Sequence, residues 1–228
     1  MGRRSARSEE GVFVVEGASL IVQAAAAGWQ IEAQYVAPGA DALALAGDVF
    51  EFAPNVIERV ASTEAPQPVL AVVHQRASEM PAHPTFVLVG DRLADPGNAG
   101  TIIRSAEAAG ADAVVFTAGS VDVFNPKVVR ASAGSLFRVP VLSLELAALQ
   151  AAGLSLLATS SHRGDAYTDT DLRRPVALMV GNEAHGVADD APVDGWITIP
   201  HAGAAESLNV AMAATVIAFE VARQRRQG

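Results

Sequence analysis

The sequence predicts an α/β fold in which a small amino-terminal domain precedes a larger domain with a mostly parallel sheet. Short runs of β-branched residues alternate with Ala-rich, helix-favouring stretches along the chain. Half of the 228 residues are hydrophobic but only 5% are aromatic, so Ala, Val, Leu and Ile must build most of the core. One stretch has no periodic pattern and contains Pro81 and Pro84. We interpret residues 77–84 as a linker between domains spanning 1–76 and 85–228.

The amino-terminal domain is expected to contain four strands and one clear helix. The Ala-rich segment 18–27 predicts the helix, and Gly28 is expected to end it. Runs rich in β-branched residues predict strands at 12–15, 31–36, 49–52 and 69–74.

The second domain continues the alternation of strands and helices. Its predicted strands are 86–90, 113–116, 139–142, 155–159, 176–180 and 196–199. Its predicted helices are 99–109, 126–131, 144–152 and a long terminal helix from about 207 to 225. The apolar runs 114–116 and 177–180 are typical of strands in the buried middle of a parallel sheet.

The composition excludes several classes of protein. The chain has no Cys, so it cannot form disulfides or thiolate metal sites, and we expect no metal. No apolar run approaches the roughly 18 residues that a membrane span requires. Residues 1–10 contain three Arg but no apolar segment follows them, so they do not form a secretory signal. A cytoplasmic location is therefore expected.

The charge balance is unusual for a nucleic-acid-binding protein, because the net charge is −9. The basic residues are nevertheless grouped. No acid occurs between Asp122 and Glu145, and this interval contains Lys127, Arg130 and Arg138. Arg also outnumbers Lys fifteen to one, and a guanidinium is the better bidentate partner for phosphate. The composition therefore permits RNA binding without predicting it.

The first of three polar clusters, residues 95–104, lies between a predicted strand and a predicted helix. Pro96 and Gly97 are turn residues, and Asn98 is a good N-cap. Arg104 follows apolar Ile103 on a helix expected to pack on the sheet, so its charge needs a partner. That partner is either Glu107, one turn further along, or the phosphate of a ligand.

The other two clusters also follow predicted strands, at the edge where open α/β sheets bind ligands. In residues 181–186, the glycines allow close backbone approach and Glu183 supplies a carboxylate. His185 has no second His at metal-ligand spacing. In residues 199–210, Ser207 and Asn209 suit the start of a helix, and Ser207 alone is explained by N-capping.

The order and spacing of the three clusters resemble one family closely. The set Asn98-x-Gly-x-x-x-Arg104, Gly181-Asn182-Glu183-x-x-Gly186, Ile199-Pro200 and Ser207-Leu208-Asn209 is similar to the motifs of the SpoU (TrmH-type) RNA methyltransferases of the SPOUT superfamily. The resemblance covers about residues 86–223, and residues 126–134 also resemble a family segment. Residues 13–17 look like the start of the family's ribosomal-protein-like substrate-binding domain. Ala184 replaces a common Gly and His201 a common Met, and an amino-terminal helix of longer members is expected to be missing.

This resemblance implies a trefoil-knot α/β domain that binds S-adenosylmethionine, largely through backbone groups. The implied cofactor-binding positions are Thr159, Gly181, Ile199 and Leu208. The reaction implied is methyl transfer to a ribose 2′-hydroxyl, with ribosomal RNA as the expected substrate. Arg104 is the implied central catalytic residue, and Asn98, Glu183, Ser207 and Asn209 would orient it and the RNA.

Several alternatives stay open from the sequence. Arg104 could act as general base, or, since a guanidinium normally keeps its proton, it could bind the adjacent phosphate and stabilise the developing alkoxide. The chain could be an inactive SpoU-like RNA-binding module, a transfer-RNA ribose methyltransferase, or an unrelated Rossmann-like enzyme. The last would need a phosphate loop, and no Gly-x-Gly-x-x-Gly occurs. The family also implies a homodimer, and Lys127, Arg130 and Arg138 are the candidate RNA-binding residues.

Overall fold

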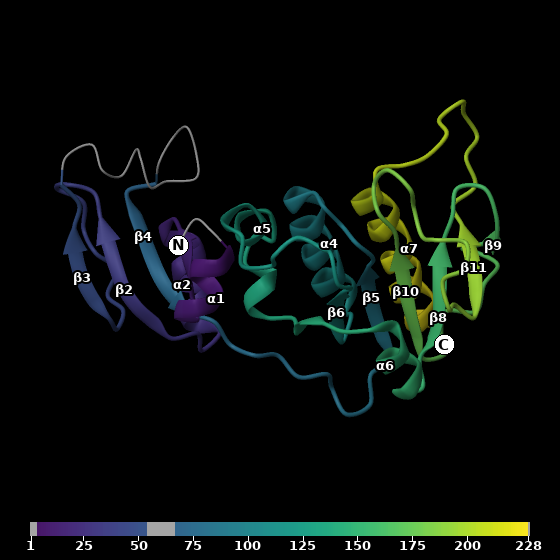
Figure 1. Ribbon diagram of the computed structural model, residues 1–228, viewed down its shortest axis with the longest axis horizontal. Coiled ribbons are helices and arrows are strands. Elements are labelled where there is room, and N and C mark those ends of the chain that lie inside the picture. Colours follow the sequence, from purple (N-terminus) through teal and green to yellow (C-terminus); the bar gives the residue numbers. More distant parts are fainter. Residues whose placement is uncertain (1–3, 54–66, 228) are drawn as a thin grey trace.

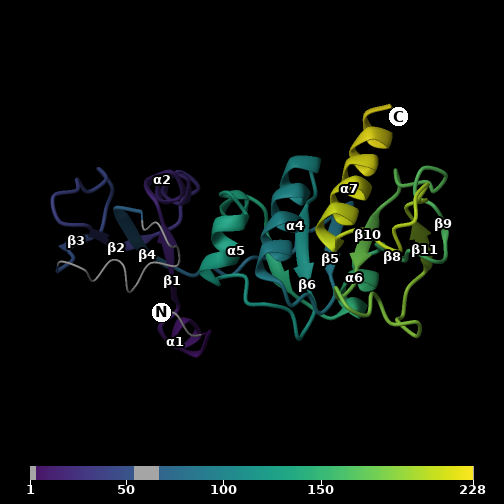
Figure 2. The same ribbon diagram turned by 90° about the horizontal axis from the view of Figure 1, so that it is seen from above.

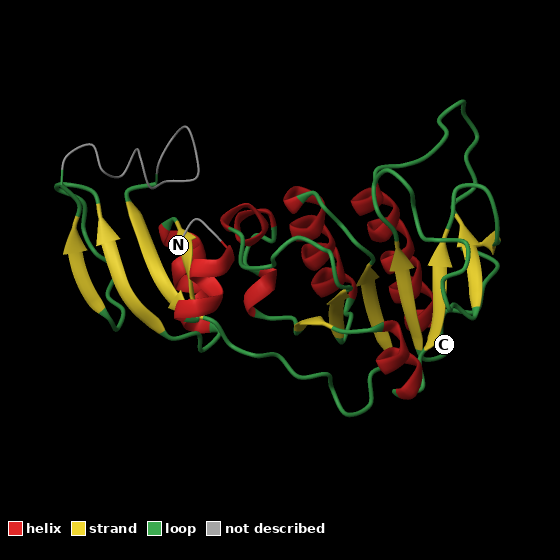
Figure 3. Cartoon of the chain, in the orientation of Figure 1, coloured by secondary structure: helices red, strands yellow, loops and turns green. Residues whose placement is uncertain are grey.

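A computed structural model of the chain describes residues 4–53 and 67–227, and within them two separate sheets are present (Figures 1 and 3). The first sheet has the strand order β1-β4-β2-β3. Strand β4 is antiparallel to both β1 and β2, whereas β2 and β3 are parallel. The strands are β1 Val12–Glu16, β2 Ile31–Val36, β3 Asp48–Glu51 and β4 Val69–His74. The predicted strands of this domain are thus present, each with ends within one residue.

Among the residues described, the amino-terminal domain has two helices, α1 (Arg4–Glu10) and α2 (Ala18–Ala26). Helix α2 was predicted, but α1 was not, and the expectation that an amino-terminal helix is missing is corrected by it. Helix α1 holds Arg7, which is buried and donates from Nε to Asp122 Oδ2 at 2.9 Å. The partner lies far away in the sequence, so a local pattern could not reveal this contact.

The second sheet has seven strands in the order β7-β6-β5-β10-β8-β11-β9, and all paired neighbours are parallel. This confirms the predicted mostly parallel sheet. The strands are β5 Phe86–Gly90, β6 Ala113–Phe116, β7 Val141–Ser143, β8 Ser155–Thr159, β9 Asp165–Ala166, β10 Val176–Val180 and β11 Gly195–Thr198. The two-residue strand β9 has no sequence signal and was not predicted.

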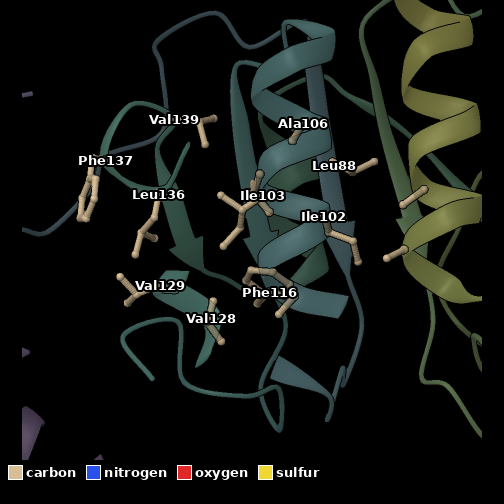
Figure 4. Close-up of a cluster of buried hydrophobic side chains, with 14 of the residues drawn as sticks. Leu88, Ile102, Ile103, Ala106, Phe116, Val128, Val129, Leu136, Phe137 and Val139 are labelled. Carbon is tan, nitrogen blue, oxygen red and sulfur yellow. The ribbon is translucent and has the colours of Figure 1, made fainter. Parts of the chain in front are cut away.

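Helices cover both faces of this sheet. Figure 2 shows α5 (Pro126–Ala131), α4 (Pro96–Ala109) and α7 (Val210–Gln227) in a row on one face. Helix α6 (Leu146–Ala151) packs on the other face, against β8. Residues of β5, β6 and β10 are buried, as their apolar runs predicted. Side chains such as Leu88, Ile102, Ile103 and Phe116 form the core beneath α4 (Figure 4).

The starts of α4 and α7 differ from the predicted ones because other residues cap them. Helix α4 begins at Pro96, since the Asp95 side chain accepts a hydrogen bond from the Asn98 amide at 2.7 Å. Asn98 is therefore inside the first turn and is not the cap. Helix α7 begins at Val210, and the Asn209 side chain accepts from the Ala211 amide at 2.9 Å. Ser207 therefore precedes the helix and does not cap it.

Residues 75–85 contain no helix or strand, and the two sheets do not belong to independent bodies. One continuous hydrophobic core includes residues of both. The Phe13 and Phe124 rings lie 4.8 Å apart, and Trp29 Nε1 donates to the Phe137 carbonyl oxygen at 3.1 Å. The segment 122–138, which contains α5 and the 3-10 helix η1 (Ser135–Phe137), thus supports the amino-terminal domain. Within the part of the chain described, no helix is long and apolar enough to cross a membrane.

Candidate active site

A pocket of about 590 Å³ opens at the carboxyl ends of β8, β10 and β11. Thr159 ends β8, Gly181 follows β10 and Ile199 follows β11. Because these strands are parallel, the loops that follow them meet at one end of the sheet, where Figure 1 shows them extending together. The first turns of α7 close another side through Val210, Ala213 and Ile217.

All four predicted cofactor-binding positions line this pocket: Thr159, Gly181, Ile199 and Leu208. The structure explains why residue 181 must be glycine, which the sequence alone did not. A Cβ on Gly181 would lie 2.1 Å from the Gly186 carbonyl carbon, so the loop can fold back on itself only with glycine here. The same loop is held by Asn182, whose side chain donates to the Arg92 carbonyl oxygen at 2.9 Å and accepts from the Ala184 amide at 2.9 Å. Asn182 is thus a positioning residue that the sequence did not single out.

A chain of hydrogen bonds joins the three motifs. Asn98 Nδ2 donates to Glu183 Oε1 at 3.1 Å, and Asn209 Nδ2 donates to Asn98 Oδ1 at 3.1 Å. Asn98 can make both contacts because Asp95, not Asn98, caps α4. Glu183 and Asn209 also line the pocket, so the chain of contacts runs from its wall to the start of α4.

The Glu183 carboxylate is stabilised in its charged form. It accepts from the backbone amides of Ala94 at 3.3 Å and Asp95 at 3.1 Å, in addition to Asn98. Partial burial acts to raise the pKa of Glu183, but the hydrogen bonds from Asn98 and the backbone amides outweigh it, and the net pKa is lowered. Glu183 is therefore an anionic anchor at neutral pH and is unsuited to be a proton donor.

Arg104 lies outside the pocket lining, on the outer face of α4. One flank of α4 packs tightly on α5 through Gly100, and the other contacts α7 through Ser105, whose hydroxyl lies 2.7 Å from Thr215 Oγ1. Arg104 is exposed between these flanks. It forms no hydrogen bond or ion pair with residues 4–53 or 67–227.

The alternative partner of Arg104 is occupied by other groups. Glu107 accepts from Arg138 Nε at 2.8 Å and from the Ser135 hydroxyl at 3.0 Å. The hydrogen bond from Arg138 lowers the pKa of Glu107 against the opposing effect of burial. Arg104 is therefore not held by Glu107, which leaves its guanidinium accessible to a ligand.

The three candidate RNA-binding residues have different surroundings. Lys127 and Arg130 are exposed on α5. Arg138 is committed to its own surface, because it contacts Glu107 and donates from Nη1 to Gln23 Oε1 at 2.9 Å. Of the other predicted site residues, Ser207 is exposed and lines the pocket.

Several pocket residues were not predicted from the sequence. They include His162 and Arg163 after β8, Asp189 after β10, and Trp196 and His201 in or after β11. For His162, Arg163 and His201, a position just after a predicted strand was the available signal. Among the described residues, no group of three or more His, Asp or Glu side chains could hold a metal ion.

The segment that contains the pocket and the three motifs matches a known protein family. A model described as the SpoU rRNA Methylase family matches residues 85–219, which include the pocket and the joined motifs. The chain belongs to the SpoU family. Residues 1–71 match a model described as the MRM3-like substrate binding domain.

Alignments with relatives named as 23S rRNA 2′-O-methyltransferases cover most or all of the chain. A 23S rRNA (uridine(2479)-2′-O)-methyltransferase of Streptomyces viridochromogenes is 33% identical, and the alignment covers 100% of this chain and 88% of the relative. The 23S rRNA (guanosine(2553)-2′-O)-methyltransferase RlmP of Bacillus subtilis is 39% identical over 73% of this chain and 69% of its own. The crystal structure of the SpoU methyltransferase AviRb from Streptomyces viridochromogenes with AdoMet has a TM-score of 0.90 and 34% identity, covering 100% of this chain and 95% of that one.

Proposed function

We propose that this SpoU protein methylates a ribose 2′-hydroxyl of ribosomal RNA with S-adenosylmethionine. It is an RNA methyltransferase of the class to which its relatives belong. The observation that carries the proposal is the hydrogen-bonded chain Glu183–Asn98–Asn209, which connects the three family motifs at the pocket. A substrate-binding domain model over residues 1–71 supports a large RNA as substrate. A cytoplasmic location is proposed together with this substrate.

The pocket fits the cofactor in size and chemistry. Its volume of about 590 Å³ is in the range of sites for small organic ligands, roughly 300–1,000 Å³. The positions proposed to hold the cofactor, Thr159, Gly181, Ile199 and Leu208, offer backbone amides and carbonyls in loops. Carboxylates of Glu183 and Glu206 line the same pocket and suit a ligand with cationic groups. When bound, S-adenosylmethionine supplies a methyl group on a sulfonium, which is activated for transfer.

Arg104 is proposed to act on the RNA and not on the cofactor. A guanidinium stays positively charged at neutral pH, so it is suited to bind the phosphate beside the reactive ribose and to stabilise negative charge on the attacking oxygen. Its lack of a partner among the described residues and its exposure support this role. Asn98, Ser207 and Asn209 would position the ribose at the pocket, while Glu183 fixes Asn98.

RNA binding is proposed to involve α5 and the amino-terminal domain packed beside it. Lys127 and Arg130 are exposed there and carry positive charge despite the net charge of −9. Arg138 would have to release Glu107 to contact RNA.

The protein is further proposed to form a homodimer through α7. Its exposed face carries Met212, Val216 and Phe219, which are 56%, 37% and 43% exposed. These positions are four and three residues apart, so they form one apolar stripe. Ile217 and Val221, also apolar, are buried on the opposite side within the chain. A second copy that covers the stripe would remove this apolar surface from water.

The function is tested by incubating the purified protein with ribosomal RNA, transfer RNA and radiolabelled S-adenosylmethionine, followed by mass mapping of ribose methylation. Methylation of ribosomal RNA at one ribose is expected. The same position should lose its methyl group in cells that lack the gene. Methylation of transfer RNA alone would overturn the proposed substrate, and the absence of transfer to any RNA would overturn the proposed activity.

A further inference from the structure

Arg163 is the single Lys or Arg among the described residues that line the cofactor pocket. It lies in the loop between β8 and β9. The carboxylates of Glu183, Asp189 and Glu206 line the same pocket. The sulfonium and ammonium groups of S-adenosylmethionine can be balanced by the carboxylates of Glu183 and Glu206, but its own carboxylate requires a cation or hydrogen-bond donors.

The Arg163 side chain is held on an aromatic surface. Its Cζ lies 3.5 Å from the centre of the Trp196 ring, which is within the range of a cation–π interaction. The loop that carries Arg163 is fixed to β11: the Ser160 amide donates to the Ile197 carbonyl oxygen at 3.0 Å. Gly164 has φ +103 and lies so close that a Cβ there would be 2.4 Å from the Trp196 carbonyl carbon. The guanidinium is thus presented to the pocket by a fixed backbone.

The present ionic partner of Arg163 is weakly held. Arg163 Nη2 lies 2.7 Å from Asp189 Oδ1, but the Asp189 side chain is 93% exposed. Exposed ion pairs of this kind contribute little, because water competes for both charges. A ligand carboxylate inside the pocket could therefore replace Asp189, and a guanidinium is well shaped to bind it through two parallel hydrogen bonds.

We propose that Arg163, supported by the Trp196 ring, binds the carboxylate of the methionine part of S-adenosylmethionine. This assignment rests on the pocket being the cofactor site and adds a side-chain contact to the backbone positions proposed above. In this proposal, Asp189 pairs with the Arg163 guanidinium only when the ligand is absent. The competing interpretation is that the Arg163–Asp189 pair only ties the two loops together.

Calorimetry with two ligands separates these interpretations. S-Adenosylmethionine and its decarboxylated form differ only in the carboxylate. The intact protein is expected to bind the decarboxylated ligand about tenfold more weakly. Arg163→Ala should bind S-adenosylmethionine about tenfold more weakly and bind both ligands alike. Arg163→Lys should recover only part of the loss, because an ammonium lacks the planar pair of donors.

Asp189→Asn is the matched control, since it removes the ion pair but leaves the guanidinium free for the ligand. It should bind S-adenosylmethionine at least as tightly as the intact protein. Equal weakening in Asp189→Asn and Arg163→Ala, or an equal loss for both ligands in Arg163→Ala, would overturn the proposal in favour of a loop tie. Unchanged binding in Arg163→Ala would also overturn it. Failure of the intact protein to bind S-adenosylmethionine at all would instead overturn the proposed function.

Discussion

Glu183 shows how one carboxylate can organise the site without taking part in proton transfer. Its lowered pKa means that the folded state holds it charged more strongly than the unfolded chain does. This stabilisation is present above the ordinary Glu pKa of about 4.3 and is lost as the pH falls through the lower folded value. Its donors, Asn98 and two backbone amides, connect the loop after β10 to the start of α4.

A Glu183→Gln variant should therefore differ from the intact protein in its pH dependence. At pH 7 it is expected to lose under about 1 kcal/mol of unfolding free energy, because the carboxylate is partly exposed. The difference should shrink between pH 5 and pH 3, as the intact protein loses the charged form. Urea unfolding of both proteins between pH 7 and pH 3 measures this difference in unfolding free energy. A difference that stays constant down to pH 3 would contradict the role of the charge.

Arg104 provides the most direct test of the catalytic assignment. Arg104→Ala should abolish methyl transfer to RNA and leave S-adenosylmethionine affinity within about twofold, because Arg104 lies outside the pocket lining. Arg104→Lys should restore little if bidentate phosphate binding matters. Transfer assays, calorimetry and circular dichroism are the measurements. A folded Arg104→Ala protein that retains activity would show that the assignment is wrong.

The sequence predicted the members of the site better than their contacts. Asn98, Glu183 and Asn209 were identified from motifs, but Asn98 was given the role of a cap. Asp95 and Asn98 are both good capping residues, and local preference cannot choose between them. The parallel sheet brings Glu183 close to Asn98. The Asn98 side chain contacts another motif because it donates to Glu183, and this contact could not be predicted from the local sequence.

At the scale of single elements, strand and helix types were predicted well and their ends less well. The strand predicted from Val139 begins at Val141, because the Val139 amide donates to the carbonyl oxygen of Ser135 in η1 and Pro140 has no amide hydrogen. Helix α1 was missed because its polar sequence has no apolar periodicity. Its position is set by contacts of Arg7 with distant residues, among them Asp122 and Gln75. A knot in the chain stays a prediction, because strand periodicity carries no information about threading.

The loop 181–187 depends on glycine at its first position. Gly181→Ala should lower the unfolding free energy by more than about 2 kcal/mol, because its Cβ would meet the backbone of Gly186 and Val187. Cofactor affinity should fall together with stability, so this variant does not isolate a ligand contact. Gly203→Ala is the control, since no atom lies within 4 Å of its added Cβ. Thermal unfolding of both variants is the measurement; equal stability would contradict the steric argument.

At the scale of the whole molecule, the two domains form one body through contacts that are distant in sequence. Arg7 and Asp122 are 115 residues apart, yet their ion pair is largely buried. Breaking such a pair leaves a buried charge and typically costs about 3–5 kcal/mol. The rigid attachment keeps the amino-terminal domain beside α5, where Lys127 and Arg130 are exposed.

Asp122→Ala should therefore lower the unfolding free energy by about 3 kcal/mol, somewhat limited by the other contacts of Arg7. Asp171→Ala is the matched control, because its pair with Arg173 is exposed and should contribute no measurable stability. Denaturant unfolding of the two variants measures the difference. Similar small losses in both would mean that the Arg7–Asp122 contact does not hold the domains together.

The apolar stripe on α7 leads to the last prediction, which concerns assembly. The intact protein should be a dimer at micromolar concentration, since Met212, Val216 and Phe219 expose apolar surface on one helix face. Phe219→Asp should produce monomers, because a second copy would have to bury the new carboxylate without a partner. Val22→Asp is the control: Val22 is 48% exposed on α2, away from the stripe, and its variant should stay dimeric. Light scattering at several concentrations decides the question; a monomeric intact protein, or a dimeric Phe219→Asp variant, would rule out assembly through this face.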